Sequence, residues 1–291
     1  MIALNRRRVM GVSGGVDIIM STETNPEMMA VVYGKGWCAS PDYMTKQEAE
    51  AVTTLGSSFC MGNTSVTHFE EFVYFTGVTQ LLTNSFRSAS NLASIVFPTS
   101  LTYIRDYCIN GTKIVSIDTK NVYYVGSQSL TLNSQLKDVV VGKAFQTVST
   151  SALTANVNIE TISVDADNPY FVTNGDYLKR LSDNFVILTT KTCDTIPEGV
   201  VGLSNNCIRG HTLTTLDLPS TLTDIAANTF YQAKITNLIC RATTPPTCAT
   251  NALSSLTVTN IYVPDASVSA YQSATGWSSY SAKIQGLSNL S

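Results

Sequence analysis

The sequence is poor in charged side chains, and only 13% of its 291 residues are Asp, Glu, Lys or Arg. The formal net charge is −3, and the one basic run, residues 6–8, is short. Nucleic-acid binding requires clustered lysines and arginines that contact phosphates. The composition therefore excludes a general nucleic-acid binding protein.

Groups that could perform catalysis are also scarce. The only two histidines, His68 and His211, lie far apart in the sequence, and no motif places a carboxylate or a thiol beside either one. The many serines have no positioned activating group, and no His-x-x-x-His pair is present. We therefore expect surface or loop histidines, a protein that is not an enzyme, and no bound metal or cofactor.

Long apolar runs are missing as well. Residues 1–24 contain three arginines, at positions 6–8, followed by a glycine-rich stretch, whereas a signal peptide needs a continuous apolar core. No stretch approaches the roughly 18 apolar residues of a membrane span. We interpret residues 1–24 as a flexible leader and expect a cytoplasmic product until export or assembly.

One segment of this leader resembles a catalytic motif. Ser13-Gly14-Gly15-Val16-Asp17 is similar to the phosphate loop of the N-type ATP pyrophosphatases, in which glycines let backbone amides approach a pyrophosphate. That family places serine after the aspartate, whereas Ile18 stands here, and Pro26 limits any following helix to about two turns. We therefore favour a leader over a nucleotide site.

What the chain does contain is a repeat, marked by a small residue followed by a large apolar residue. The landmark occurs at Ser85-Phe86, Cys108-Ile109, Ser129-Leu130, Ala152-Leu153, Cys207-Ile208, Thr229-Phe230 and Ala252-Leu253. Five of the six intervals are 21–23 residues and one is 55 residues. A fixed period of this size is typical of a solenoid, whose units bury their apolar faces against one another. The long interval predicts one period plus an insertion.

Each copy continues into an apolar triplet at constant spacing, as in the segment 92–97. The last two members of a triplet are two residues apart, so they point to the same side of a strand, and successive coils stack these strands in parallel. We interpret Phe69, Phe72 and Tyr74 as an earlier copy. The pattern predicts a β-rich α/β solenoid with parallel strands over residues 64–264.

Both ends of the array carry cap signals. Asn25 and Pro26 predict one helix start, and Thr45 with Glu48 predicts a capping box at a second. We therefore expect a helical N-terminal cap over residues 25–63, with Trp37 against the first coil. Residues 265–291 are expected to form a helical C-terminal cap, plugged by Tyr271, Trp277 and Tyr280.

The interruption of the array has a different signal. Asn174-Gly175 lies between two apolar runs, which is a strong indication of a β-hairpin. We expect a small antiparallel meander, within an insertion at about residues 165–195, that projects from one coil.

The seven cysteines form no Cys-x-x-Cys pair, and their odd number leaves at least one thiol unpaired. Cys108 and Cys207 fall at the small position of the repeat, so we expect buried packing thiols. Cys240 and Cys248 could approach each other across a loop, but nothing requires a disulfide.

Candidate binding residues follow from the phase of the repeat, because two columns of positions between the inward triplet residues face out from the strands. Such a sheet face is the usual recognition surface of solenoids; the alternative is that short polar residues merely solvate it. The candidates are Glu71, Asp118, Asp138, Asp217, Asn237, Asn260 and Tyr262. A separate column precedes the small position, and we interpret it as a turn-stabilising ladder; its members are Asn84, Asn206, Asn228 and Asn251.

The copies beginning at Leu92 and Leu213, with Ile196-Pro197-Glu198-Gly199-Val200, resemble the BspA-type leucine-rich repeats of bacterial and protozoan surface proteins. This resemblance covers residues 64–264 and implies a leucine-rich repeat solenoid. Members of that family are associated with adhesion to host proteins and surfaces. The leader and residues 69–77 are also similar to proteins carried by phages and mobile elements of gut anaerobes.

The resemblance implies two function classes. The first is a recognition or adhesion protein on an extracellular surface or a virion, which binds a protein or glycan of a cell surface through the sheet face. The second is a structural virion or appendage protein that assembles with itself or with virion partners. An enzyme is the least favoured reading.

Overall fold

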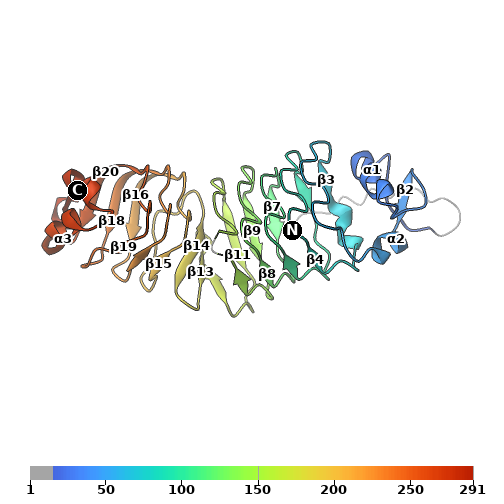
Figure 1. The fold of residues 1–291 in the computed structure, drawn as a ribbon. Helices are drawn as coiled ribbons and strands as arrows, with labels where there is room; N and C mark the ends of the chain where they lie inside the picture. The colour runs from blue at the N-terminus through green and yellow to red at the C-terminus, as the bar shows by residue number, and fades with distance from the viewer. Residues whose placement is uncertain (1–15, 150, 291) are drawn as a thin grey trace.

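In the computed structural model, which describes residues 16–149 and 151–290, the chain forms an elongated array of stacked coils (Figure 1). Each coil has three sides, which we name the first sheet face, the second sheet face and the turn face. The first sheet face consists of β3 (His68–Phe69), β5 (Ser94–Ile95), β7 (Ser116–Asp118), β9 (Asp138–Val141), β11 (Thr161–Val164), β16 (Thr212–Leu218), β18 (Lys234–Cys240), β20 (Thr257–Val263) and β21 (Ile284–Gly286). All pairs among these strands are parallel, which confirms the predicted solenoid.

The second sheet face carries mostly two-residue strands. They are β4 (Gln80–Leu81), β6 (Tyr103–Ile104), β8 (Tyr124–Val125), β10 (Thr147–Val148), β12 (Phe171–Thr173), β13 (Tyr177–Arg180), β14 (Phe185–Thr189), β15 (Gly202–Leu203), β17 (Asp224–Ile225) and β19 (Thr247–Cys248). They form two sheets, one from β4 to β10 and one from β12 to β19. The apolar side chains of all three sides meet in the core between them.

The turn face contains the small and large apolar landmark of each repeat. Backbone hydrogen bonds join successive turns, as from Phe86 N to the oxygen of Cys108 at 2.7 Å. Most turns hold two residues of left-handed backbone four positions apart, such as Asn228 (φ 56°) and Gln232 (φ 60°). Every member of the predicted asparagine column occupies the first of these positions. Asparagine tolerates this conformation better than most residues, so the column belongs to the turn.

The N-terminal end of the array carries β1 (Ile18–Ser21), α1 (Pro26–Gly34), β2 (Tyr43–Thr45) and α2 (Lys46–Ala51). The side chain of Asn25 accepts a hydrogen bond from the backbone of Met28, and Thr45 forms a capping box with Glu48. Trp37 stacks on Phe59 with ring centroids 5.4 Å apart. Residues 13–15 of the motif that resembles a phosphate loop lie outside the described residues, as does most of the predicted leader.

The C-terminal end is closed by 3-10 helices and one short α-helix around two buried rings. The segments are η2 (Asp265–Ser267), α3 (Val268–Ser273), η3 (Ser278–Lys283) and η4 (Leu287–Asn289). The rings of Tyr271 and Trp277 are fully buried, with centroids 5.0 Å apart. The indole nitrogen of Trp277 donates to the backbone oxygen of Pro246 at 3.0 Å, which ties the cap to the last coil.

The meander does not project from a coil, contrary to the prediction. Strands β12, β13 and β14 pair antiparallel, but β14 then pairs in parallel with β15 and so continues the second sheet face. Buried side chains such as Phe171 and Leu178 make the meander part of the core. An exposed hairpin would leave these apolar residues in water, which explains why it lies within the array.

The meander adds unequal length to the three sides of the solenoid. The second sheet face gains three strands, whereas the first sheet face gains one segment, in which Lys191 N donates to Ile159 O and Thr195 bridges to Asp217. The turn face gains none, because Gly210 lies directly against Val157 of the preceding complete coil. Each added strand lengthens its side of the array by about 4.8 Å. The second sheet face is therefore the longest of the three sides, and the array must curve with this face outward. Figure 1 shows β13 and β14 on this outer edge.

Candidate recognition surfaces

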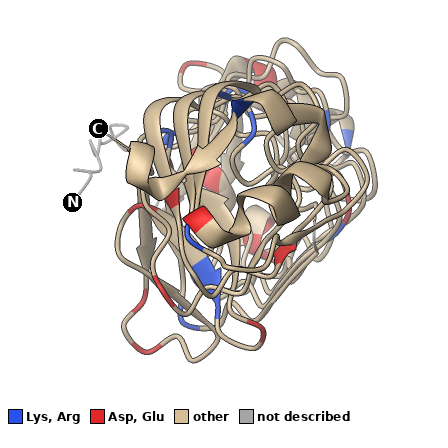
Figure 2. Cartoon of the chain, turned by 90° about the vertical axis from the view of Figure 1, so that its left-hand side faces the viewer, with Lys and Arg blue, Asp and Glu red and all other residues tan. Residues whose placement is uncertain are grey.

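The first sheet face is most regular over β16, β18 and β20, whose seven-residue strands lie in register. Thr215, Asn237 and Asn260 are neighbours across these strands, and all three side chains are partly exposed. Figure 2, which views the array from its C-terminal end, shows residues of both charges scattered around the coils. The array therefore presents polar groups and charges of both signs rather than a surface of one sign.

Three amide side chains form a row across the strands. Asn260 Nδ2 donates to Asn237 Oδ1 at 2.9 Å, and Gln285 Nε2 of β21 donates to Asn260 Oδ1 at 3.2 Å. We call Asn237, Asn260 and Gln285 the amide row. The sequence predicted the first two members, which the structure brings together. Gln285 was missed because β21 comes from the C-terminal cap and belongs to no repeat.

Asp217 lies one strand further along and is not a free carboxylate. Arg241 Nε and Nη2 donate to its two oxygens at 2.8 and 2.7 Å, so the pair is bidentate. The hydrogen bonds to Asp217 raise the pKa of Arg241, although both side chains remain partly exposed. Sequence reasoning missed Arg241, although it stands 24 positions after Asp217, close to one repeat. The Arg241 guanidinium remains partly exposed to solvent beside its two hydrogen bonds to Asp217.

The acidic candidates of the N-terminal half are separate from this row. Asp138 accepts a hydrogen bond from Thr161 Oγ1 at 2.6 Å. Asp118 is exposed, accepts from the backbone of Lys120 at 2.9 Å, and lines a shallow hollow with Lys143 and Asp165. Lysines and carboxylates alternate there, so this hollow has no net preference for charge.

The predicted site residue Glu71 does not lie on a strand of the first sheet face. Phe69 pairs with Ile95, so the first copy is shifted by three residues and His68 faces out beside Ser94. Glu71 lies instead in the 3-10 helix η1 (Glu70–Tyr74), where it accepts a hydrogen bond from Asn25 Nδ2 at 3.1 Å. The interpretation of residues 69–74 as a repeat copy in that phase was therefore wrong.

Tyr262 is buried, with 5% of its surface exposed, and cannot serve as an open binding residue. The column rule assumed a bare sheet face, but β21 pairs with β20 and places Gln285 beside Tyr262. The 3-10 helix η4 also lies against β20. The cap therefore helps to cover Tyr262, and its neighbour on β18, Ile239, is buried as well.

The histidines are not arranged for catalysis. His211 lies in the loop that precedes β16, which is one of the two expected positions, but it is buried, and its Nε2 lies 2.8 Å from the backbone oxygen of Thr190. Burial lowers the pKa of His211. The only described partner of the partly exposed His68 ring is Thr67 Oγ1, 3.0 Å from Nδ1. No cluster of metal-ligating side chains occurs within residues 16–149 and 151–290.

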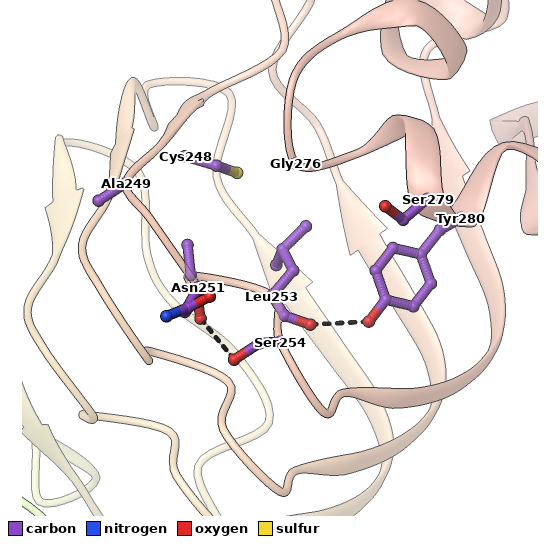
Figure 3. Close-up of a pocket in the computed structure, with 9 residues that line it drawn as sticks. Cys248, Ala249, Asn251, Leu253, Ser254, Gly276, Ser279 and Tyr280 are labelled. Carbon is purple, nitrogen blue, oxygen red and sulfur yellow. Dashed lines mark hydrogen bonds between the residues drawn. The ribbon is translucent and has the colours of Figure 1, made fainter.

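A notch of about 270 Å³ lies between the last turn and the C-terminal cap (Figure 3). Figure 3 shows the thiol of Cys248 on one side and the Tyr280 hydroxyl on the other, where it donates to the oxygen of Leu253 at 2.7 Å. Burial raises the pKa of Cys248 to about 12, so the thiol is protonated and unreactive at neutral pH. The notch offers no activated nucleophile.

Comparison with known proteins identifies the repeat. The model of the BspA type leucine-rich repeat region matches six copies over residues 54–174 and 189–280. The unmatched interval, residues 175–188, contains most of the meander. No curated protein sequence matches the chain.

Three solved structures are similar to the chain. A leucine-rich repeat protein from Eubacterium ventriosum has 18% identity and a TM-score of 0.56, and covers 74% of this chain and 65% of its own. The pneumococcal vaccine antigen PcpA has 12% identity and a TM-score of 0.41, with 65% and 66% covered. A leucine rich cell surface protein from Faecalibacterium prausnitzii has 15% identity and a TM-score of 0.40, with 77% and 64% covered. The chain thus spans less than two thirds of each of these proteins.

The first of these structures supports the fold alone, because its sequence identity is low.

Within the part of the chain that the structure describes, no helix combines the length and apolarity that crossing a membrane requires. The family model, by contrast, matches well over half of the chain. The chain therefore belongs to the BspA-type leucine-rich repeat family.

Proposed function

We propose that this chain is a non-enzymatic recognition protein that binds a protein on a cell surface through its first sheet face. The observation that carries the proposal is the amide row, whose hydrogen bonds fix three partly exposed side chains in one orientation. A fixed orientation reduces the conformational entropy that the side chains lose on binding. The amide row can thus offer hydrogen-bond donors and acceptors to a partner with little further loss of side-chain entropy.

The shape of this face favours an extended partner. The long strands β16, β18 and β20 make a continuous strip with the Asp217–Arg241 pair at its edge. Small ligands are normally held in concave, mostly apolar pockets, whereas the outward positions here are partly exposed polar groups on a sheet. A protein surface can contact the whole strip. Display on a cell surface or a virion is part of this proposal.

The test measures binding of the labelled full chain to cultured animal cells before and after the cells are treated with protease or with glycosidases. The variant Asn237→Ala/Asn260→Ala/Gln285→Ala should lose at least tenfold in affinity. A matched control is Asp224→Asn/Thr247→Ala, which changes exposed positions on the second sheet face of neighbouring coils.

Loss of binding after protease treatment supports a protein partner, whereas loss after glycosidase treatment alone contradicts it. Equal binding by the triple variant would show that the amide row is not the site. A chain that binds no cells but assembles with itself or with virion proteins would replace this proposal with the structural function.

A further inference from the structure

A cluster of three tyrosines lies on the second sheet face, away from the amide row. Tyr103 and Tyr124 are in register on the neighbouring strands β6 and β8, with ring centroids 6.1 Å apart. The ring of Tyr123 lies 5.9 Å from that of Tyr103. Tyr103 and Tyr123 are 36% and 38% exposed, so the rings form an open aromatic platform.

An arginine is fixed at one side of this platform. The guanidinium of Arg105 lies over the ring of Tyr103, 4.9 Å from its centroid, and its Nε donates to Gln80 Oε1 at 3.1 Å. Among the described residues, no carboxylate forms an ion pair with it. The terminal nitrogens of Arg105 therefore remain available for an anion, held in place by the ring and the amide.

The fold does not require these aromatic residues. The register that places Tyr103 beside Tyr124 continues to Gln80 on one side and Thr147 on the other. The second sheet face therefore forms equally well with an amide or a hydroxyl at this position. Cross-strand aromatic pairs do stabilise sheets, but that role is compatible with burial and does not require a cation without an ion-pair partner beside two exposed rings and a third that is partly exposed.

We propose that Tyr103, Tyr123, Tyr124 and Arg105 form a binding site for an acidic polysaccharide. The apolar C–H faces of a pyranose ring can pack on the exposed aromatic rings, whose faces carry partial negative charge. The planar guanidinium can bind a carboxylate or sulfate substituent through two parallel hydrogen bonds. Rings and arginine are contiguous, so one acidic sugar unit can contact both.

This site is independent of the amide row, because the two lie on different sheet faces and in coils on either side of the meander. A substitution that abolishes binding at one surface should leave binding at the other surface unchanged. A chain could therefore fail to bind a cell-surface protein and still bind the polysaccharide, and the reverse also holds.

The experiment measures affinity of the full chain for hyaluronan, heparin and dextran by titration at fixed ionic strength. Hyaluronan supplies carboxylates, heparin adds sulfates, and dextran is neutral. We expect binding to at least one acidic polymer and none to dextran, with at least a tenfold loss for Tyr103→Ala and for Arg105→Gln. Arg105 is exposed, so the second variant tests the site even if the first is unstable.

A matched control exists on the turn face, where the guanidinium of Arg209 lies 4.8 Å from the ring centroid of Tyr231. Arg209→Gln removes the same charge from the same kind of contact, and it should leave the affinity unchanged. Equal losses from Arg209→Gln and Arg105→Gln would reduce the effect to net charge and overturn the proposal. Failure to bind any acidic polymer, or equal binding of dextran, would overturn it as well.

Discussion

His211 Nε2 lies 2.8 Å from the backbone oxygen of Thr190 and 3.0 Å from Thr189 Oγ1. Thr189 ends the last strand of the meander, and His211 ends the first turn after it. This contact therefore joins the meander to the coils that follow it, at the point where the apolar core divides into two clusters.

The contact should make folding stability depend on pH. Burial lowers the pKa of His211 in the folded state, whereas the unfolded chain titrates near a pKa of about 6.5. Below about pH 6.5 the unfolded state therefore binds more protons, and stability should fall as the pH decreases towards the folded pKa. Urea unfolding between pH 7.5 and 5 measures this slope.

The variant His211→Gln keeps a donor for the oxygen of Thr190 but has no proton to gain. It should have a smaller slope of unfolding free energy over the same pH range. His68→Gln is the control, because that ring is partly exposed and forms no contact with the meander. An unchanged slope in His211→Gln would assign the pH dependence to other groups.

The repeat was predictable because its inward residues recur with the period of the coil, and inward residues decide the register of the strands. Leu216 and Leu238, for example, are predicted equivalents and do pair across β16 and β18. The outward columns over the central coils follow from the same register, which is why Asn237 and Asn260 were found.

The remaining features depend on contacts that a period cannot encode. Tyr262 is covered by a strand that follows the last repeat, and His211 is buried where it packs against Thr189 and Thr190 at the end of the meander. The aromatic platform was missed because only the longer strand of each copy was considered. Tyr103 and Tyr124, one repeat apart in the sequence, were the available signal.

The C-terminal cap can be tested at Trp277. The side chain is fully buried and donates to the oxygen of Pro246, so Trp277→Ala removes a large apolar contact and one hydrogen bond. We expect a loss of about 3–5 kcal/mol in unfolding free energy and lower solubility as the last coil becomes exposed. Denaturant titration and the soluble fraction after expression measure these effects.

The control is Tyr74→Ala, which also replaces an aromatic side chain by a methyl group, but at a position that is 39% exposed. It should change the unfolding free energy by less than about 1 kcal/mol. Unchanged solubility of Trp277→Ala would count against the role of residues 265–291 as a cap.

The thiols should be inert in the folded protein. The seven cysteines all lie within the described residues and are free, and burial raises the pKa of Cys60, Cys108 and Cys193 to about 12. At pH 8 the thiolate fraction of such a group is about one in ten thousand. Mass spectrometry after brief exposure to iodoacetamide should find these residues unmodified in the native protein and all seven modified in guanidinium. Rapid native modification of Cys108 would contradict its assignment as a packing residue.

The turn-face asparagines can be separated from the sheet-face asparagines by their backbone conformation. Asn228 has φ 56°, a left-handed value at which a residue with a Cβ atom is strained and glycine is not. Asn228→Ala should therefore cost about 1 kcal/mol in unfolding free energy, while Asn228→Gly should change it by less, because glycine adopts this φ without strain. Asn237 lies within the parallel strand β18, so there the order reverses and glycine is the worse substitution. If alanine were the better residue at both positions, the asparagine column would owe its place to its side-chain amides and not to the turn.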